Sequence, residues 1–474
     1  INFLPGIVLT SAGSITLDAT TGNGNGKLFA NEEVTLNAAN GITLNDSLNT
    51  SINAPGGVTI NADTDGIGGG TLTVADGATI DSVNNAIAIT ADDLNLNTTG
   101  SLNSGTALTT LLVSDGGTIG LGDTAGGFTL SGAELQNISA TGLVLGDATS
   151  GDITVNNITA ANSNNITGTV TLNATRDNAT LTFATAASTF NAIAANADDR
   201  ITVNVDLTTD VGNLALDGDA DGVGVPDTND DIVFANGVTL TTAGSLSLLA
   251  AGGGLSPLGA LTLSAANGLT FGANLAVAAA TIFNADNDAN GVGTFTVNTA
   301  ATISTAGNLL TVIAADIDLT NGSLNSGAAA TVLRSTNGRT IGLGATTRDF
   351  TLSGAELQNI TATGLTIGDG TNGSITVNGI TAANSNNITG TVTLDATLDN
   401  ATVTFATGAS TFNALTASAD DGIAVDVAVT TDVGGLALEG DADNTPDTAT
   451  VGDKVTFAAG LTITSAGAIT LDAT

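Results

Sequence analysis

Residues 128–143, FTLSGAELQNISATGL, return almost unchanged as FTLSGAELQNITATGL at residues 350–365, an offset of 222 residues. The string NSNNITGTVTL at Asn162 returns at Asn384 with the same offset. A chain with such internal repeats builds a one-dimensional stack in which each repeat contacts only its neighbours. The repetition therefore predicts a protein whose function depends on its length and surface more than on a single active site.

A third repeat begins near the end of the chain. Residues 457–474, FAAGLTITSAGAITLDAT, match FLPGIVLTSAGSITLDAT at residues 3–20 and FANGVTLTTAGSLSL at residues 234–248. We therefore predict one super-repeat copy over residues 1–233, a second over residues 234–456 and the start of a third over residues 457–474. Because the chain opens and closes inside the same motif, we expect it to be a length of a longer repetitive polypeptide.

The composition argues against a row of ordinary globular domains. Among 474 residues, Cys, Met, Trp, Tyr and His are absent, Lys and Arg number 7, and Asp and Glu number 45, which gives a net charge of −38. Without Cys there is no disulfide framework, and without His no side chain has an ordinary pKa near neutrality. Since a basic face is also missing, we expect no nucleic acid partner, and we expect an atmosphere of cations that includes divalent ions.

This composition suits long exposure outside a cell. The chain has no sulfur to oxidise and few sites for a trypsin-like protease. No run of about eighteen apolar residues is present, so we expect no membrane span. The expected location is extracellular or on a cell surface.

Short strings with a period of two predict strands throughout the chain. Examples are VTL at Val34, ITV at Ile153 and LTF at Leu181, separated from their neighbours by Gly, Asn and Asp turn residues. Helical periodicity is nearly absent. Such strands suit either a row of β-sandwiches or a β-solenoid. A row of sandwiches would show aromatic-anchored cores and more Pro in its linkers, whereas the chain has no Trp or Tyr and only 5 Pro. A solenoid needs only tight corners and a thin column of small aliphatic side chains, so we predict an all-β solenoid.

Several repeated strings carry a family resemblance. They are SLNSG at Ser101 and Ser323, TIGLG at Thr118 and Thr340, GLVLGD at Gly142 and GLTIGD at Gly364. In these strings the chain resembles the giant secreted filamentous haemagglutinin-like proteins of bacteria. The resemblance implies a right-handed parallel β-helix that acts as a surface adhesin, an exoprotein or a fibre.

The two copies also test for catalytic residues, because a residue that acts in every unit should be kept in both. The cationic positions are not kept: Arg176 aligns with Leu398, Arg200 with Gly422, Arg339 with Gly117 and Arg348 with Gly126. With no His, the usual groups that clamp an acidic substrate or stabilise an oxyanion are missing. A polysaccharide lyase or glycosidase could use the paired acids at residues 198–199 and 420–421, but the basic residue and aromatic platforms are not retained. We therefore expect no enzymatic activity.

Alternating carboxylates, in contrast, are kept between the copies. The loop LDGDADGVGVPDTNDD carries Asp217, Asp219, Asp221 and Asp227, and its counterpart LEGDADNTPDTATVGD carries Glu439, Asp441, Asp443 and Asp447. Alternation in a turn directs oxygens toward one centre, the arrangement that Ca²⁺ needs, and Gly222 supplies a sharp turn. We predict structural Ca²⁺ sites in these two loops; the alternative is that Asp, Asn and Gly simply form turns on a solvated corner. For residues 61–65 and 284–288 we favour plain turns.

Together these features predict a structural building unit of an extracellular filament or giant cell-surface fibre. In it, stacked β-coils would continue covalently or end to end. The expected partners are copies of the same chain or further repeats of it, together with divalent cations. The alternative is a bacterial adhesin or carbohydrate-binding surface protein that uses loops on a β-helix stalk, with surface polysaccharide as its partner.

Overall fold

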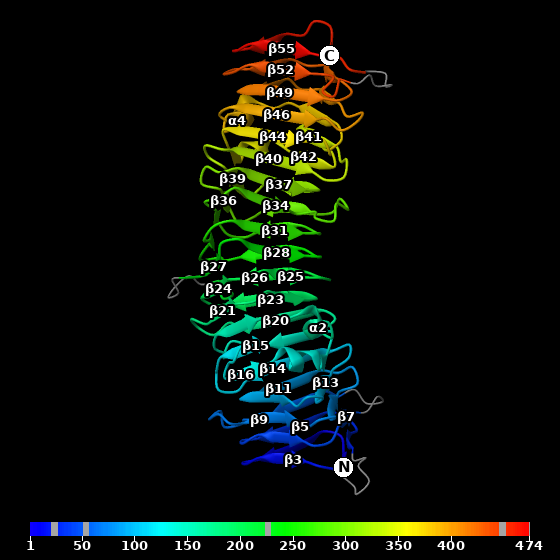
Figure 1. Ribbon diagram of the computed structural model, residues 1–474, viewed down its shortest axis with the longest axis vertical. Coiled ribbons are helices and arrows are strands. Elements are labelled where there is room, and N and C mark those ends of the chain that lie inside the picture. The colour runs from blue at the N-terminus through cyan, green and yellow to red at the C-terminus, as the bar shows by residue number, and fades with distance from the viewer. Residues whose placement is uncertain (20–26, 51–55, 223–228, 445–451, 474) are drawn as a thin grey trace. The chain divides into compact units, whose positions relative to one another are not determined.

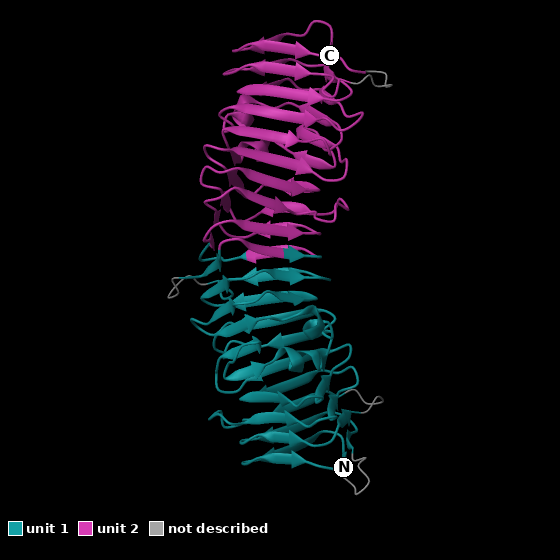
Figure 2. Ribbon diagram, viewed as in Figure 1, with its two compact units in different colours: residues 1–235, 241–243, 249–254 teal, residues 236–240, 244–248, 255–474 magenta. Residues whose placement is uncertain are grey.

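The computed structural model describes residues 1–19, 27–50, 56–222, 229–444 and 452–473. The chain forms two compact units, shown in different colours in Figure 2. Unit 1 comprises residues 1–235, 241–243 and 249–254, and unit 2 comprises residues 236–240, 244–248 and 255–474. Strands dominate both units, and no helix of the described residues is long and apolar enough to cross a membrane.

Unit 1 is built from columns of parallel strands, in which each strand pairs with strands of neighbouring coils (Figure 1). The longest column contains β2 (Ile7–Ser11), β5 (Val34–Ala38), β8 (Val58–Asn61), β11 (Ile87–Ala91), β14 (Leu108–Val113), β18 (Gly142–Leu145), β20 (Thr169–Ala174), β23 (Ala192–Ala197) and β26 (Leu214–Asp217). A second column has the order β16 (Phe128–Leu130), β15 (Ile119–Gly122), β19 (Ile153–Asn156), β21 (Thr180–Phe183), β24 (Arg200–Val203) and β27 (Asp231–Phe234).

Shorter columns complete the coils of unit 1. One contains β1 (Asn2–Phe3), β4 (Leu28–Ala30), β7 (Leu48–Thr50), β10 (Thr79–Asp81), β13 (Ser101–Asn103) and β17 (Ile138–Ser139). Another contains β3 (Ile15–Leu17), β6 (Ile42–Leu44), β9 (Thr71–Val74) and β12 (Asp93–Leu96), and β22 (Ser188–Phe190) pairs with β25 (Leu207–Thr209).

Unit 2 repeats this construction. Its longest column contains β31 (Leu261–Ala265), β34 (Thr281–Asn284), β37 (Leu310–Ala314), β40 (Ala330–Ser335), β44 (Gly364–Gly368), β46 (Thr391–Ala396), β49 (Ala414–Ala419), β52 (Leu436–Glu439) and β55 (Ile469–Asp472). The column that corresponds to the second column of unit 1 has the order β42 (Phe350–Leu352), β41 (Ile341–Gly344), β45 (Ile375–Asn378), β47 (Val403–Phe405), β50 (Ile423–Val425) and β53 (Val455–Phe457).

The remaining strands of unit 2 form three further columns. The first contains β29 (Leu246–Leu249), β32 (Leu269–Phe271), β35 (Thr294–Val297) and β38 (Asp316–Asp318). The second contains β30 (Leu255–Pro257), β33 (Leu275–Ala276), β36 (Thr302–Ser304), β39 (Ser323–Asn325) and β43 (Ile360–Thr361). The third contains β48 (Ser410–Phe412), β51 (Val429–Thr431) and β54 (Ile463–Ser465). Strand β28 (Val238–Thr242) has the same alternating burial as the others.

Alternation along most strands separates a buried face from an outer face. In β5, Val34 and Leu36 are fully buried while Thr35 faces outward. The parallel register places Val34 beside Val58 and Leu36 beside Ile60, so like side chains stack from coil to coil. Each buried aliphatic side chain contributes about 1.5–3 kcal/mol of hydrophobic stabilisation. The structure confirms the predicted all-β parallel β-solenoid architecture.

Short helices interrupt the coils at corresponding places in the two units. In chain order they are α1 (Gly132–Gln136), α2 (Ala160–Ser163), α3 (Gly354–Gln358) and α4 (Ala382–Ser385). Helix α1 begins with a capping box, in which Ser131 Oγ accepts from Glu134 N–H and the Glu134 carboxylate accepts from Ser131 N–H. Helices of little more than one turn leave no helical periodicity for sequence analysis to detect.

The TIGLG strings mark a close approach of two backbone segments. Strand β15 pairs with β16, and the loop of residues 123–127 that joins them lies against Gly120. A Cβ atom on Gly120 would lie 2.5 Å from the carbonyl oxygen of Thr124. In unit 2, Gly342 meets the backbone of Thr346 in the same way. The loop can pack over the strand in both units only because this position has no side chain.

Candidate functional site

The two predicted calcium loops follow β26 and β52 and begin with the same turn. Asp219 N–H donates to Oδ1 of Asp217 at 3.2 Å, and Asp441 N–H donates to Oε1 of Glu439 at 3.1 Å. The side chain that ends each strand therefore caps the loop backbone. The pKa of Asp217 is raised overall, because burial and the negative charge of Asp219 outweigh the lowering effect of the hydrogen bond from Asp219 N–H.

The second acid of each loop is buried. Asp219 is 3% exposed, and its carboxylate accepts a hydrogen bond from Gly222 N–H at 3.0 Å and another from Gly252 N–H. Asp441 is 8% exposed, and its Oδ1 has no hydrogen-bond partner among the described residues. Asp219 therefore holds its loop through backbone donors, whereas Oδ1 of Asp441 has no donor in the part of the chain that the structure describes.

The remaining predicted ligands do not complete a metal centre in the part of the chain that the structure describes. Asp221 and Asp443 are exposed, and Asp227 and Asp447 lie outside the described residues. Within residues 1–19, 27–50, 56–222, 229–444 and 452–473, no three His, Cys, Asp or Glu side chains form a group that could hold a metal ion. The described residues show caps and turns at these loops, and calcium binding stays a prediction.

Two aspartates that we interpreted as turn residues also join distant coils. Asp63 Oδ2 accepts from Ser114 Oγ at 2.6 Å, and Asp286 accepts from Thr336 Oγ1, partners that are 51 and 50 residues away. Both aspartates are at most 2% exposed. Because the partners lie far along the chain, no local sequence signal indicates these bonds.

The paired acids at residues 198–199 and 420–421 contain one buried cap each. Asp198 Oδ2 accepts from Asn178 N–H, and Asp420 Oδ2 accepts from Asn400 N–H, both at 2.7 Å. The two units thus use the same carboxylate to hold the same turn. This repetition gives the first member of each pair a structural role.

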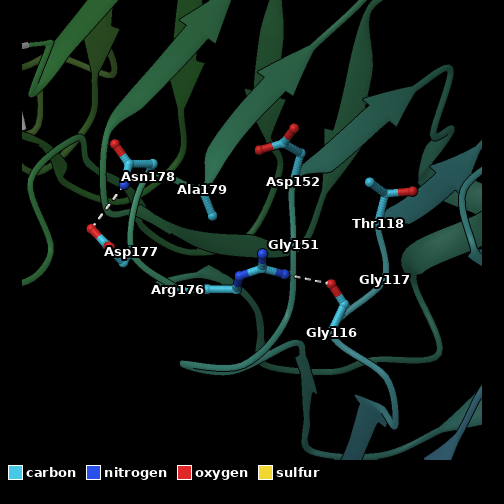
Figure 3. A pocket seen from close by; sticks show the side chains of 9 residues that line it. All are labelled: Gly116, Gly117, Thr118, Gly151, Asp152, Arg176, Asp177, Asn178 and Ala179. Atoms are coloured by element: carbon cyan, nitrogen blue, oxygen red, sulfur yellow. Dashed lines mark hydrogen bonds between the residues drawn. The ribbon is translucent and has the colours of Figure 1, made fainter. Parts of the chain in front are cut away.

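A cleft of about 330 Å³ lies near this turn in unit 1 (Figure 3). Its lining comes from the segments that precede β15, β19 and β21, three neighbouring strands of one column. The lining residues are Gly116, Gly117, Thr118, Gly151, Asp152, Arg176, Asp177, Asn178 and Ala179. Since parallel strands begin at the same edge of a sheet, these three segments stack and form one polar surface. We call it the Arg176 cleft.

Hydrogen bonds orient the charged groups of the Arg176 cleft. Arg176 Nη1 donates to the carbonyl oxygen of Gly116 at 2.9 Å, and Figure 3 shows the guanidinium extending across the cleft toward that carbonyl. Asp152 Oδ1 accepts from Thr180 N–H at 2.8 Å and from Thr180 Oγ1 at 3.1 Å. Asp177 Oδ1 accepts from Asn178 Nδ2 at 2.9 Å. The cleft therefore presents one positive group and two negative groups.

The corresponding residues of unit 2 keep most of the lining of the Arg176 cleft, but they keep only one of its three charged residues, Asp177, as Asp399. Six of the nine lining residues are identical in the second copy. The other three differ: Gly117, Asp152 and Arg176 correspond to Arg339, Ser374 and Leu398. Arg339 does not replace Arg176, because its guanidinium donates to the carbonyl oxygen of Asp349. Sequence comparison detected the loss of Arg176 in the second copy, but not that Arg176 lies in a cleft.

Compared with family models, curated proteins and solved structures, the chain matches none of them.

Proposed function

We propose that this chain is a structural building unit of an extracellular filament or giant cell-surface fibre. Support comes from the ladders of parallel strands, which bind each coil to the next through backbone hydrogen bonds and a column of buried aliphatic side chains. Such a stack grows in one dimension and resists extension along its length. The resemblance to filamentous haemagglutinin-like proteins supports a secreted surface location.

The observation that carries the proposal is that the same apolar positions stack from coil to coil, and β55 provides the positions at which this stacking can be tested. Ile469 and Leu471 in β55 are 48% and 52% exposed, whereas Leu246 and Leu248, which align with them, are 1% and 0% exposed. Leu246 and Leu248 are covered by the pairing of β29 with β32. The coil that contains β55 offers the same apolar side chains and strand edge to a further coil. That coil would come from further repeats or from a second copy of the chain.

A charge placed on the open face tests this proposal. The double variant Ile469→Lys and Leu471→Lys should abolish concentration-dependent association of the protein in sedimentation velocity and the fibres seen by electron microscopy. Thr470→Lys is the control, because Thr470 pairs with the outward-facing Ala437, so that a lysine there places a charge of the same sign on the same strand but away from the core. Association that is absent from the unmodified chain, or equal in the double variant and the control, would contradict end-to-end stacking.

Structural Ca²⁺ at the loops of Asp219 and Asp441 belongs to the same proposal. With 45 acidic and 7 basic residues, stacked coils repel one another, and bound divalent cations would reduce that repulsion. The Oδ1 atom of Asp441, which is buried and without a donor among the described residues, supports a cation at that loop.

The second candidate function is an adhesin or carbohydrate-binding surface protein. The Arg176 cleft is the observation that favours it, because a polar cleft of this size suits a small ligand. Two of its three charged residues, Asp152 and Arg176, are not shared by the two copies, which is the pattern of a local site on a repeated structural frame.

A further inference from the structure

We propose that the Arg176 cleft of unit 1 binds an uncharged saccharide through its hydroxyl groups. This inference does not depend on the filament role, and it specifies a ligand class for the adhesin alternative. It rests on the hydrogen-bonding groups that the cleft leaves available, on the charges that surround them, and on the changes at the same position in unit 2.

The cleft offers donors and acceptors side by side. Arg176 has five N–H donors, and the hydrogen bond to Gly116 is the one that it makes among the described residues. Asp152 and Asp177 each use Oδ1 within the protein, and no bond within the described residues engages Oδ2 of either carboxylate. A hydroxyl group both donates and accepts. Neighbouring hydroxyls of one sugar ring could therefore accept from Arg176 and donate to Asp152 or Asp177.

The surrounding charges disfavour ions of either sign. An anionic ligand would meet Asp152 and Asp177 and the field of a chain with net charge −38. A cationic ligand is attracted from a distance by the net charge of the chain, but within the cleft it would lie beside the guanidinium of Arg176, which forms no ion pair among the described residues and repels it at short range. A neutral ligand with several hydroxyl groups is repelled by neither charge, so this is the class that the cleft selects.

The shape of the cleft agrees with a short saccharide. A volume of about 330 Å³ is at the lower end of the range for small-molecule sites, about 300–1,000 Å³. Gly116, Gly117 and Gly151 line it, and a Cβ atom on Gly116 or Gly151 would lie 2.8 or 3.1 Å from a backbone oxygen, so closely packed backbone forms this part of the wall. No aromatic side chain lines the cleft, so no ring stacks on the sugar and the affinity should be weak, with a Kd of about 1 mM.

Unit 2 supplies a natural variant of this site. There Leu398 replaces the guanidinium and Ser374 replaces one carboxylate, while Asn400 keeps the backbone bond to Asp420 that Asn178 makes to Asp198. The frame therefore folds without the guanidinium of Arg176 and the carboxylate of Asp152. The double variant Asp152→Ser and Arg176→Leu gives these two positions the residues of unit 2, and we expect it to fold normally.

Saturation-transfer NMR with neutral tetrasaccharides of glucose, galactose, mannose and xylose tests the inference on the full chain. We expect at least one of them to bind and to slow hydrogen exchange at residues 116–118 and 176–179. The double variant should weaken that binding at least tenfold, and Arg176→Lys, which keeps the charge but loses the planar fork, at least threefold. A tetrasaccharide of galacturonate should bind at least tenfold more weakly than the best neutral one.

The inference is overturned if none of the four neutral tetrasaccharides binds. It is also overturned if the double variant binds the saccharide as the unmodified chain does, or if the galacturonate tetrasaccharide binds equally well. Circular dichroism of both variants checks that the fold is intact. End-to-end association is measured separately by sedimentation, so failure of saccharide binding and failure of the filament proposal are distinguishable.

Discussion

Replacing Gly120 with alanine should open one corner of unit 1. The new Cβ atom would lie 2.5 Å from Thr124 O and 2.7 Å from both Ala125 C and Gly126 N. All three are backbone atoms, so no side-chain rotation can relieve the contact, and the loop of residues 123–127 must move. This loop leads directly into Phe128, which is fully buried. Displacing it therefore strains the pairing of β15 with β16.

Overpacking of this kind costs about 1–3 kcal/mol. In a solenoid each coil contacts only its neighbours, so the loss should be local. Hydrogen exchange measured by mass spectrometry on peptides that cover residues 119–130 is the suitable assay, because it reports local opening. A loss of this size corresponds to exchange that is roughly 5- to 150-fold faster, since about 1.4 kcal/mol changes an equilibrium tenfold.

Gly127 provides the matched control in the same loop. A Cβ atom there would meet its nearest neighbours, Thr118 O and Thr118 N, at 3.4 and 3.6 Å, which is ordinary contact. Gly127→Ala should therefore change exchange less than about threefold, as for other surface substitutions within about 0.5 kcal/mol. If Gly120→Ala exchanges no faster than Gly127→Ala, the steric explanation of the TIGLG strings is wrong.

Three further predictions concern charge, backbone strain and cations. Burial raises the pKa of Asp93, Asp217 and Asp316, so these carboxyl groups bind protons more tightly in the folded state than in the unfolded state. The melting temperature, followed by circular dichroism, should therefore increase as the pH falls from 7 toward the ordinary pKa of these groups, 3.8. Asp316→Asn should flatten that increase, and stability that falls over the same range in the unmodified protein would contradict the sign. Ala300 has a φ of 59°, so Ala300→Gly should relieve backbone strain and increase the free energy of local opening at residues 298–301 by about 0.5–1 kcal/mol. Hydrogen exchange there should become slower, and faster exchange would refute this. Removing Ca²⁺ with a chelator should lower the melting temperature and fragment fibres, and Asp441→Asn should reduce the effect; a melting temperature unchanged by the chelator would eliminate the calcium prediction.

The strands could be predicted from the sequence because their signal is local. The alternation of Val34 and Leu36 with Thr35 is visible in three consecutive residues of the sequence, and in β5 it separates a buried face from an outer face. The short helices were missed, although Ser131 and Glu134 in the string LSGAELQ form the S-x-x-E signature of a capping box. That signature, applied at both copies, would have located α1 and α3.

The candidate sites could be predicted only in part, because their geometry depends on coils that are far apart in sequence. The acidic letters of the Asp219 loop indicated either turns or a cation site, and no local feature shows that its carboxylate reaches Gly252. The sequence shows no partner for Arg176, because the carbonyl group that accepts its hydrogen bond belongs to Gly116, 60 residues earlier. Loop lengths and strand register decide which residues of different coils lie next to each other. Comparison of the two sequence copies shows only which residues differ between them.

X-ray diffraction from oriented filaments formed by this chain tests the central claim most directly. If coils stack along the filament, the spacing between neighbouring strands, about 4.8 Å, must appear as a strong reflection on the meridian. A filament without this reflection, or with it on the equator, would contradict a fibre built from stacked β-coils of this chain.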